Sequence, residues 1–154
     1  MDEVVFDAEF DSLTPTKILC FSYTVCNKDK EEVKTLYDYN DITTFLAGCI
    51  DGGSYLVGHN IILFDLPALS RILGISFETV PKVDTLALSW YLFPDRRKHS
   101  LESYDKEEKV QIINWNEVSK EKLTERCESD VKITLDLWKK QKQRLLEIYE
   151  KSEY

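Results

Sequence analysis

Short apolar runs bounded by turn-forming residues dominate the first 40 positions of the chain. The runs are rich in Val, Ile, Phe, Tyr and Thr, which favour strands, and polar turns at 14–16 and 27–30 separate them. The pattern predicts three strands, over residues 3–10, 17–25 and 33–39. Because the connections are short, we expect the three strands to pair as an antiparallel meander.

In the remainder of the chain, short apolar runs alternate with segments whose apolar residues recur at helical spacing. Short strands are predicted over 55–57 and 79–83. Helices are predicted from an N-cap at Asp41 to Cys49, then over 64–73, 85–92, 100–105 and about 121–150, the last with a break near Cys127. Strands followed by strands that alternate with helices are typical of an α/β protein with a mixed sheet.

The length and charge of the chain limit its organisation and its partners. Its 154 residues, 43% of them hydrophobic, predict one domain over 1–154 with one sizeable core. The net charge of −8 argues against tight non-specific binding of nucleic acid through Lys and Arg, unless metal ions cover some of the acids. The basic cluster from Arg96 to His99 fits a solvated loop or a phosphate-contacting loop equally well.

The cysteines and histidines do not form a recognisable zinc motif. The four cysteines lack C-x-x-C spacing, and the two histidines are too few to complete a site, so we expect buried, reduced thiols in a cytoplasmic protein. The acidic start, Met1 to Glu3, is not typical of a signal peptide. No apolar run is long enough to cross a bilayer, and we therefore expect no membrane partner.

Two carboxylates lie at the end of the first predicted strand. Side chains alternate across a strand, so Asp7 and Glu9 should project from the same face. Neighbouring anions repel each other and resist dehydration, and a hard divalent cation such as Mg²⁺ or Mn²⁺ removes both costs. Taken alone, the pair fits an edge strand with two solvated acids better than it fits a metal site.

Two further acids stand at positions where their environment is informative. Asp65 follows a predicted strand and loop and begins a helix, where the helix dipole alone would favour an acid. Asp130 lies within the last helix, at the edge of an apolar stripe that includes Cys127, Val131 and Leu135. An acid near a core face needs a partner, although a solvated helical acid is the simpler alternative.

In this order and spacing, the four acids resemble the DEDD (DnaQ-like) 3′–5′ exonucleases of the RNase H-like superfamily. Asp7 and Glu9 match the first motif, Asn60 through Asp65 the second, and Asp130 the third. The closest likeness is to the exonuclease domain of phage family A DNA polymerases, carried by the segments 59–69, 84–86 and 99–102. The resemblance covers residues 4 to about 140 and implies a mixed five-stranded RNase H-like sheet flanked by helices.

The resemblance also implies a metal-dependent site. In that family four carboxylates hold two divalent ions, Mg²⁺ or Mn²⁺, at the scissile phosphate. Carried over to this chain, Asp7 would bridge both ions. Glu9 and Asp130 would bind the ion beside the attacking water, and Asp65 would help to hold the second.

The same resemblance implies substrate contacts for His59, Asn60, Leu63 and Phe64. Asn60 could equally cap the loop, and Phe64 fits a core position at least as well. Asp84 is interpreted as the N-cap of the helix that begins at Thr85 rather than as a further metal ligand.

One position departs from the family pattern. The family carries a Tyr four residues, or a His five residues, before its last Asp, whereas this chain has Arg126 and Glu125 at those positions. Arg126 shares a helix face with Asp130 and keeps its charge, so it cannot act as a base. It could bind the scissile phosphate as a catalytic residue, or pair with Asp130 and have no catalytic task. Glu125 as the base is a further hypothesis.

The sequence therefore predicts a 3′–5′ exonuclease that hydrolyses single-stranded DNA from its 3′ ends by a two-metal mechanism. The prediction includes a proofreading role beside a polymerase domain or replisome, in the host cytoplasm if a phage encodes the chain. An RNA or oligonucleotide exonuclease of the same fold is one alternative. A non-catalytic nucleic-acid-binding module is the other, because Arg126 replaces the usual Tyr or His.

Overall fold

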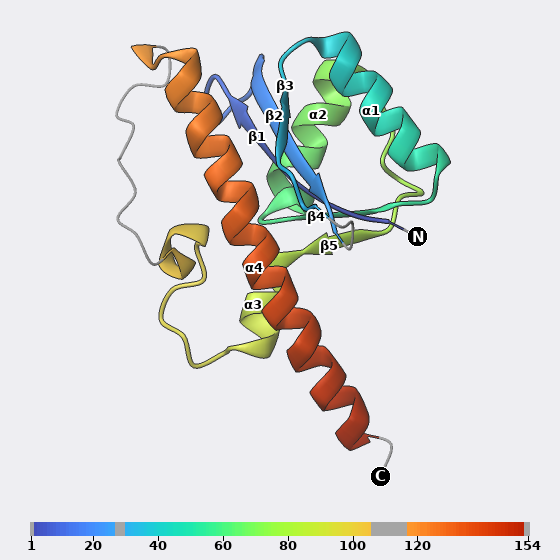
Figure 1. Cartoon of the computed structure of the whole chain (residues 1–154), viewed down its shortest axis with the longest axis vertical. Coiled ribbons are helices and arrows are strands. Elements are labelled where there is room, and N and C mark those ends of the chain that lie inside the picture. The colour runs from blue at the N-terminus through green and yellow to red at the C-terminus, as the bar shows by residue number, and fades with distance from the viewer. Residues whose placement is uncertain (1, 27–29, 106–116, 153–154) are drawn as a thin grey trace.

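A computed structural model describes residues 2–26, 30–105 and 117–152 of the chain. Five strands and six helical segments follow one another in these residues (Figure 1). In chain order they are β1 (Glu3–Phe10), β2 (Ile18–Val25), β3 (Lys34–Leu36), α1 (Tyr39–Asp51), β4 (Tyr55–Gly58), the π-helical turn η1 (Ile61–Asp65), α2 (Leu66–Leu73), β5 (Lys82–Asp84), α3 (Thr85–Leu92), the 3₁₀ turn η2 (Leu101–Tyr104) and α4 (Lys120–Ser152).

The strands form one mixed sheet in the order β3-β2-β1-β4-β5. The first three strands pair antiparallel, which confirms the predicted meander, and β4 and β5 join in parallel. The predicted α/β class with a five-stranded mixed sheet is confirmed. β1 therefore lies at the centre of the sheet, with β2 on one side and β4 on the other.

Alternation along β1 gives the sheet two different faces. Its even-numbered positions from Val4 to Phe10 are buried in a core cluster with residues of α1 and α2. Val5 points the other way, into a second cluster with Val131 and Leu135 of α4. Figure 1 shows α1 and α2 together on one side of the sheet and α4 running across the other. Asp7 and Glu9 share the face of Val5, because side chains alternate along a strand.

Several predicted boundaries are corrected by local hydrogen bonding. The first helix begins at Tyr39 and its N-cap is Asp38 rather than Asp41, because the Asp38 carboxylate accepts the backbone N–H of Asn40 and Asp41. The predicted helix over 64–73 is divided, since a π-helical turn precedes an α-helix that starts at Leu66. The long helix α4 continues through Cys127 without the predicted break.

Smaller differences concern the edges of the sheet. β3 covers residues 34–36 of the predicted 33–39, and β5 covers 82–84 rather than 79–83. The predicted turn over 27–30 falls mostly outside the described residues. In the segments that the structure describes, no helix combines the length and apolar content needed to cross a membrane.

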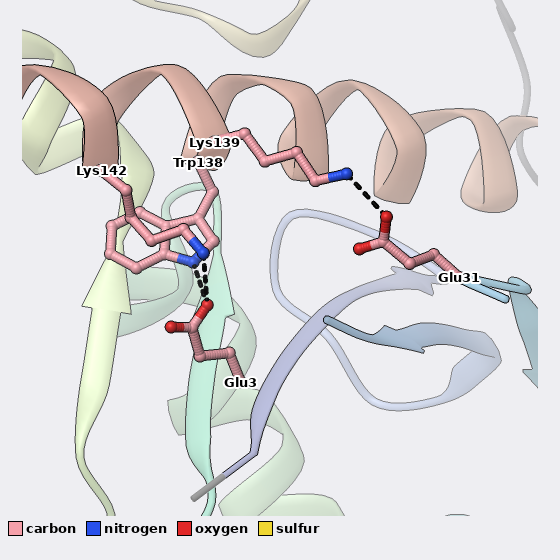
Figure 2. Close-up of polar contacts among 5 residues, drawn as sticks. All are labelled: Glu3, Glu31, Trp138, Lys139 and Lys142. Atoms are coloured by element: carbon pink, nitrogen blue, oxygen red, sulfur yellow. Dashed lines mark hydrogen bonds and ion pairs between the residues drawn. The ribbon is translucent and has the colours of Figure 1, made fainter. Parts of the chain in front are cut away.

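A polar contact fastens α4 to the start of β1. Figure 2 shows Trp138 and Lys142 of α4 converging on one oxygen of Glu3, at 3.0 Å from the indole Nε1 and 2.8 Å from Nζ. Nearby, Lys139 donates to Glu31 at 2.7 Å. Burial raises the pKa of Glu3, but the hydrogen bonds from Lys142 and Trp138 outweigh it, so the pKa lies below its ordinary value. The ionised form of Glu3 thus favours the folded chain.

We expect Glu3→Gln to lower the free energy of unfolding by about 1 kcal/mol at pH 7, because a partly buried charge-assisted contact is lost. A lowered carboxyl pKa contributes stability above the unfolded-state pKa, and this contribution disappears as the pH falls through the folded-state pKa. The wild-type advantage should therefore shrink on acidification, as measured by urea unfolding at several pH values. Glu147→Gln, which breaks the exposed pair with Arg144, is the matched control and should change little. Equal effects of both substitutions would contradict this role for Glu3.

Candidate active site

β1 carries the first two predicted site residues on the face that α4 covers. Asp7 lies opposite Ser22 of β2, and Glu9 lies opposite Cys20, just before a register shift at Phe10. Both acids are half-buried. The predicted orientation of the D-x-E pair toward one face is consistent with this register, and the pair lies on a central strand rather than on an edge.

Asp65 approaches β1 because the chain turns sharply after β4. Gly58 ends β4, and a Cβ at this position would lie 2.3 Å from Ile61 Cγ2, which leaves no room for any other residue. Asn60 adopts a left-handed conformation with φ of 61°, and the π-helical turn follows. Asp65 is 6% exposed, and its carboxylate makes a hydrogen bond with the backbone of Ala8, beyond the part of β1 that pairs with β4.

Asp84 holds this turn in place. Its carboxylate accepts the backbone N–H of Leu86 at 3.0 Å, which confirms the predicted N-cap of α3. It also accepts the backbone N–H of Asn60 at 2.9 Å and of Ile62 at 3.1 Å. The second role was not predicted, because nothing in the local sequence reveals that β5 ends beside the loop after β4. Asp84 therefore positions the segment that carries Asp65.

α4 brings the third motif to the same face. Asp130 is 8% exposed, and Cys127, one turn earlier, is fully buried. The Cys127 thiol donates to the backbone carbonyl of Asp7 at 3.2 Å, so this part of α4 lies directly against the centre of β1. All four cysteines lie in the described segments, and each is buried as a free thiol.

The four acids influence one another electrostatically. Burial raises the pKa of Asp7 well above its ordinary value, and the charges of Glu9, Asp130 and Asp65 raise it further. Burial raises the pKa of Asp65 to about 8, and the charge of Glu9 contributes, although the hydrogen bond with Ala8 opposes the shift. Strand, turn and helix thus place Glu9, Asp65 and Asp130 within electrostatic reach of Asp7. Of these four acids, Asp7 and Glu9 are the two whose ligand atoms fall, among the described residues, in one group within 4.8 Å.

This arrangement has the chemistry of a cation site. Asp7 Oδ2 and Asp65 Oδ2 are buried and have no hydrogen-bond partner among the described residues. Ligand atoms of Asp7, Glu9 and Cys127 all lie within 4.8 Å of one another. Crowded carboxylate oxygens without donors suit a hard divalent ion, which would reverse both the repulsion and the raised pKa values. The residues present therefore fit the metal that the sequence pattern implies.

Arg126 contacts a residue outside the four acids. Its guanidinium lies 3.6 Å from Glu102 of η2, and its side chain is 18% exposed. This pair joins α4 to the segment before residue 106. The contact with Glu102 was not predicted, because the two residues are 24 positions apart and no local sequence pattern links them.

The predicted substrate residues divide into two groups. The His59 ring nitrogens contact Thr85 Oγ1 at 2.8 Å and the carbonyl of His99 at 2.9 Å, so the ring links the end of β4 to α3 and the residue 99 loop. Its contact with substrate stays a prediction. The backbone N–H of Asn60 donates to the Asp84 carboxylate and so helps to fix the turn. This agrees with the predicted loop-capping role, except that the backbone and not the side chain makes the contact.

Leu63 and Phe64 lie at a cleft. Leu63 is 83% exposed, whereas Phe64 packs edge-on against Phe10, with ring centroids 5.7 Å apart. The cleft has a volume of about 390 Å³ and extends from η1 and α2 to the loop after β1. Its other lining residues include Leu13, Pro15, Pro67 and Arg71.

Leu13 also lines this cleft, and the sequence analysis did not single it out. It is 89% exposed, and it lines the cleft together with Leu63. Asp11 stabilises this loop by accepting the backbone N–H of Thr16 at 2.9 Å and of Lys17 at 3.0 Å. The available signal was an apolar residue in an otherwise polar turn, only four residues after Glu9.

Comparison with known proteins shows what this fold resembles. No family model and no curated protein sequence matches the chain. Among solved structures, NrnC of Brucella melitensis bound to pGG matches with a TM-score of 0.72 and 20% identity over 98% of this chain and 76% of that one. The zinc-bound E. coli exonuclease I complex with single-stranded DNA matches with a TM-score of 0.62 and 14% identity over 97% of this chain.

A third similar structure is the family B DNA polymerase of the archaeon Pyrobaculum calidifontis, with a TM-score of 0.64 and 17% identity over 90% of this chain. The chain spans 24% of that polymerase and 42% of the exonuclease I chain. The chain shares the fold of these structures, a mixed five-stranded sheet flanked by helices. The predicted fold class is therefore confirmed. Because the sequence identities are only 14–20%, the likeness establishes a common fold and not a common activity.

The raised pKa of Asp65 predicts how the metal-free chain responds to pH. Between the ordinary carboxyl pKa near 4 and the folded value of about 8, the folded chain binds more protons than the unfolded chain. The free energy of unfolding should therefore fall as the pH rises through this range. We expect Asp65→Asn to flatten the dependence and to stabilise the metal-free chain by about 2 kcal/mol at pH 8, as measured by denaturant unfolding in chelator.

Asp84→Asn is the matched control for this measurement, because it also removes a buried carboxylate. It should destabilise the chain by about 1–3 kcal/mol, since the carboxylate accepts three backbone N–H groups that an amide oxygen cannot fully satisfy. Stabilisation by Asp84→Asn, or destabilisation by Asp65→Asn, would contradict the roles assigned to these two acids.

Proposed function

We propose that this chain is a divalent-metal-dependent 3′–5′ exonuclease that hydrolyses terminal phosphodiester bonds of single-stranded nucleic acid. The observation that carries the proposal is the convergence of Asp7, Glu9, Asp65 and Asp130 from β1, η1 and α4. A single helix or strand cannot produce this cluster. The fold shared with exonuclease I and NrnC supports the proposal, because those structures contain single-stranded DNA and pGG, respectively.

Each acid has a distinct place in the proposed site. The charges of the other three acids all raise the pKa of Asp7, and this carboxylate would help to hold both divalent ions. Glu9 and Asp130 would hold one ion, and Asp65, fixed through its hydrogen bond with the Ala8 backbone, would hold the other. The bound ions, Mg²⁺ or Mn²⁺, would activate water and balance the negative charge that develops on the phosphate.

The cleft would suit the terminal nucleotides of a single strand. Leu13 and Leu63 line it with exposed apolar side chains, and Phe64, which also lines it, packs against the core. Apolar contacts with bases and sugars tolerate any sequence, which suits stepwise degradation from an end. Arg71, which lines the same cleft, is positioned by donating to the carbonyl of Pro15.

Arg126 is proposed to bind the scissile phosphate rather than to act as a base. Its guanidinium stays protonated, and planar donors match phosphate oxygens in pairs. In the structure it faces Glu102, whose side chain is 64% exposed and can move away when a more highly charged phosphate arrives. This contact gives the guanidinium a defined position in the absence of substrate.

Single-stranded DNA is the proposed substrate, and RNA or short oligonucleotides are the alternative. The likeness to NrnC with pGG favours oligonucleotides, whereas the likeness to exonuclease I favours longer DNA. The proofreading role, the association with a polymerase or replisome, the origin in a phage family A polymerase and the cytoplasmic location stay predictions from the sequence.

The proposed activity is tested with a single-stranded oligonucleotide labelled at its 5′ end, as DNA and as RNA. With Mg²⁺ or Mn²⁺, the wild-type chain should produce a ladder that shortens from the 3′ end, and chelator should stop it. Asp7→Asn and Asp130→Asn should each reduce the rate by about 10³-fold or more, because they remove direct ligands of the catalytic ions.

Asp136→Asn is the matched control for Asp130→Asn, since Asp136 is exposed on the same helix. It should retain full activity. A wild-type chain that binds the oligonucleotide but leaves it intact with either metal would favour the non-catalytic binding module.

Arg126→Ala should lower kcat/KM by about 10- to 100-fold, because charge-assisted hydrogen bonds to the phosphate are lost. Arg126→Lys should recover part of this loss, while Glu102→Gln should leave activity equal or higher, since it frees the guanidinium. Steady-state kinetics on one labelled oligonucleotide would measure all three. If Arg126→Ala and Glu102→Gln both leave kcat/KM unchanged, Arg126 only joins α4 to η2.

A further inference from the structure

The Cys127 thiol lies at the candidate metal site although it belongs to none of the three motifs. It is fully buried on α4, and its proton is donated to the backbone carbonyl of Asp7 at 3.2 Å. One ligand atom from each of Asp7, Glu9 and Cys127 lies within 4.8 Å of the other two. The site therefore contains a sulfur atom beside two carboxylates.

Packing alone does not require a cysteine at this position. Cys127 belongs to a small cluster with Cys20 and Leu123, where a side chain of similar size and no sulfur would fill the same space. What distinguishes the thiol is its position next to the strand carboxylates. A thiol at such a place can exchange its proton for a metal ion.

Asp65 provides an independent indication that the cluster binds a cation. Its Oδ2 is buried and lacks a hydrogen-bond partner among the described residues, and the side chain is 6% exposed. Its carboxylate bonds the backbone of Ala8, the residue between Asp7 and Glu9. A buried, unpartnered carboxylate oxygen is thus held against the strand segment that carries Asp7 and Glu9.

We propose that Asp7, Glu9 and Cys127 form a binding site for a thiophilic divalent cation such as Zn²⁺, with Asp65 available as a fourth ligand. Thiolate ligands select zinc and cadmium over magnesium and manganese, which prefer oxygen. An ion held by the sulfur would occupy the place of the hard ions and inhibit the nuclease. This inhibitory consequence rests on the proposed function, whereas the metal site itself does not.

The geometry requires only a small adjustment. Bonds of about 2.3 Å to sulfur and 2.1 Å to oxygen place tetrahedral zinc ligands about 3.5 Å apart. Side-chain rotations that move the ligand atoms by about 1 Å would bring the three atoms from within 4.8 Å to this spacing. Binding would release the thiol proton to water and form a sulfur–metal bond, so that no oxidant or reductant is involved.

Two binding measurements on the full chain test the site. In the first, Zn²⁺ should raise the melting temperature of the wild-type protein, and Cys127→Ser should bind Zn²⁺ about 10- to 100-fold more weakly, since even outer-shell partners of a metal have effects of this size. The response of Cys127→Ser to Mn²⁺ should stay close to that of the wild type. In the second, Cd²⁺ should produce the ultraviolet absorption band of a cadmium–thiolate bond, saturating at one equivalent.

Cys26→Ser is the matched control, because Cys26 is equally a buried free thiol but lies in the cluster around Val5 and Trp138. It should keep the zinc affinity and the cadmium band. Asp7→Asn keeps the Cys127 thiol and should weaken Cd²⁺ binding, which tests the site even if Cys127→Ser fails to fold. A cadmium band that is absent from the wild type, or that is unchanged in both Cys127→Ser and Asp7→Asn, would overturn the proposal.

The inhibitory part is measured by adding Zn²⁺ to the exonuclease assay at fixed Mg²⁺. The wild-type chain should lose activity at a Zn²⁺ concentration about tenfold or more below that needed for Cys127→Ser. Thiolate-dependent metal binding without any digestion would sink the nuclease proposal and leave the metal site standing. Digestion that Zn²⁺ affects equally in both proteins would leave the nuclease proposal standing and overturn the inhibitory role of Cys127.

Discussion

The repulsion among carboxylates that are held together away from water is the constraint on which the rest of this structure depends. Asp7 lies at the centre of the sheet, and the charges of Glu9, Asp65 and Asp130 all raise its pKa. Such a cluster opposes folding unless a cation is bound, because each charge loses hydration and gains repulsion. A chain that keeps it must therefore hold the acids in place by contacts made elsewhere.

Those contacts surround the cluster. Asp84 accepts three backbone N–H groups and fixes the turn that carries Asp65, while Trp138 and Lys142 bind Glu3 and hold α4 against β1. On the opposite face, the even-numbered residues of β1 are buried against α1 and α2. This apolar burial stabilises the sheet independently of the acids. The chain can therefore tolerate the electrostatic repulsion among the acids and stay folded.

The same organisation relates the chemistry of the site to its surroundings. The exposed apolar cleft formed in part by Leu13 and Leu63 would suit bases and sugars. The guanidinium of Arg126, on the same helix as Asp130, would suit phosphate and stands where the resembled family has its Tyr or His. The proposed thiolate ligand Cys127 would add sulfur to an oxygen-rich site, and its metal preference would then differ from that of carboxylates alone. In the proposed function, substrate binding, charge balance and metal choice would depend on residues of β1, η1 and α4 and their immediate neighbours.

The sequence by itself determined the strands, the meander and the long helix, because these follow from local periodicity and from short connections. Asp7 and Glu9 share a face for the same reason. The four acids were singled out as a set by their resemblance to the ordered motifs of a family. Local patterns could not reveal that the N-cap of α1 is Asp38 and not Asp41, since both are acids near the start of the same helix. They also could not reveal that a π-helical turn replaces the first turn of the next helix.

Only the tertiary structure decided which distant groups meet. Asp84 contacts the turn at Asn60, Glu102 contacts Arg126, and the thiol of Cys127 reaches the carbonyl of Asp7, across 120 positions of sequence. No cysteine spacing predicts the last of these, since zinc motifs are recognised by neighbours in sequence. Parallel pairing of β4 beside β1 and the crossing of α4 over the sheet create these contacts, and both depend on packing between elements rather than on any one of them.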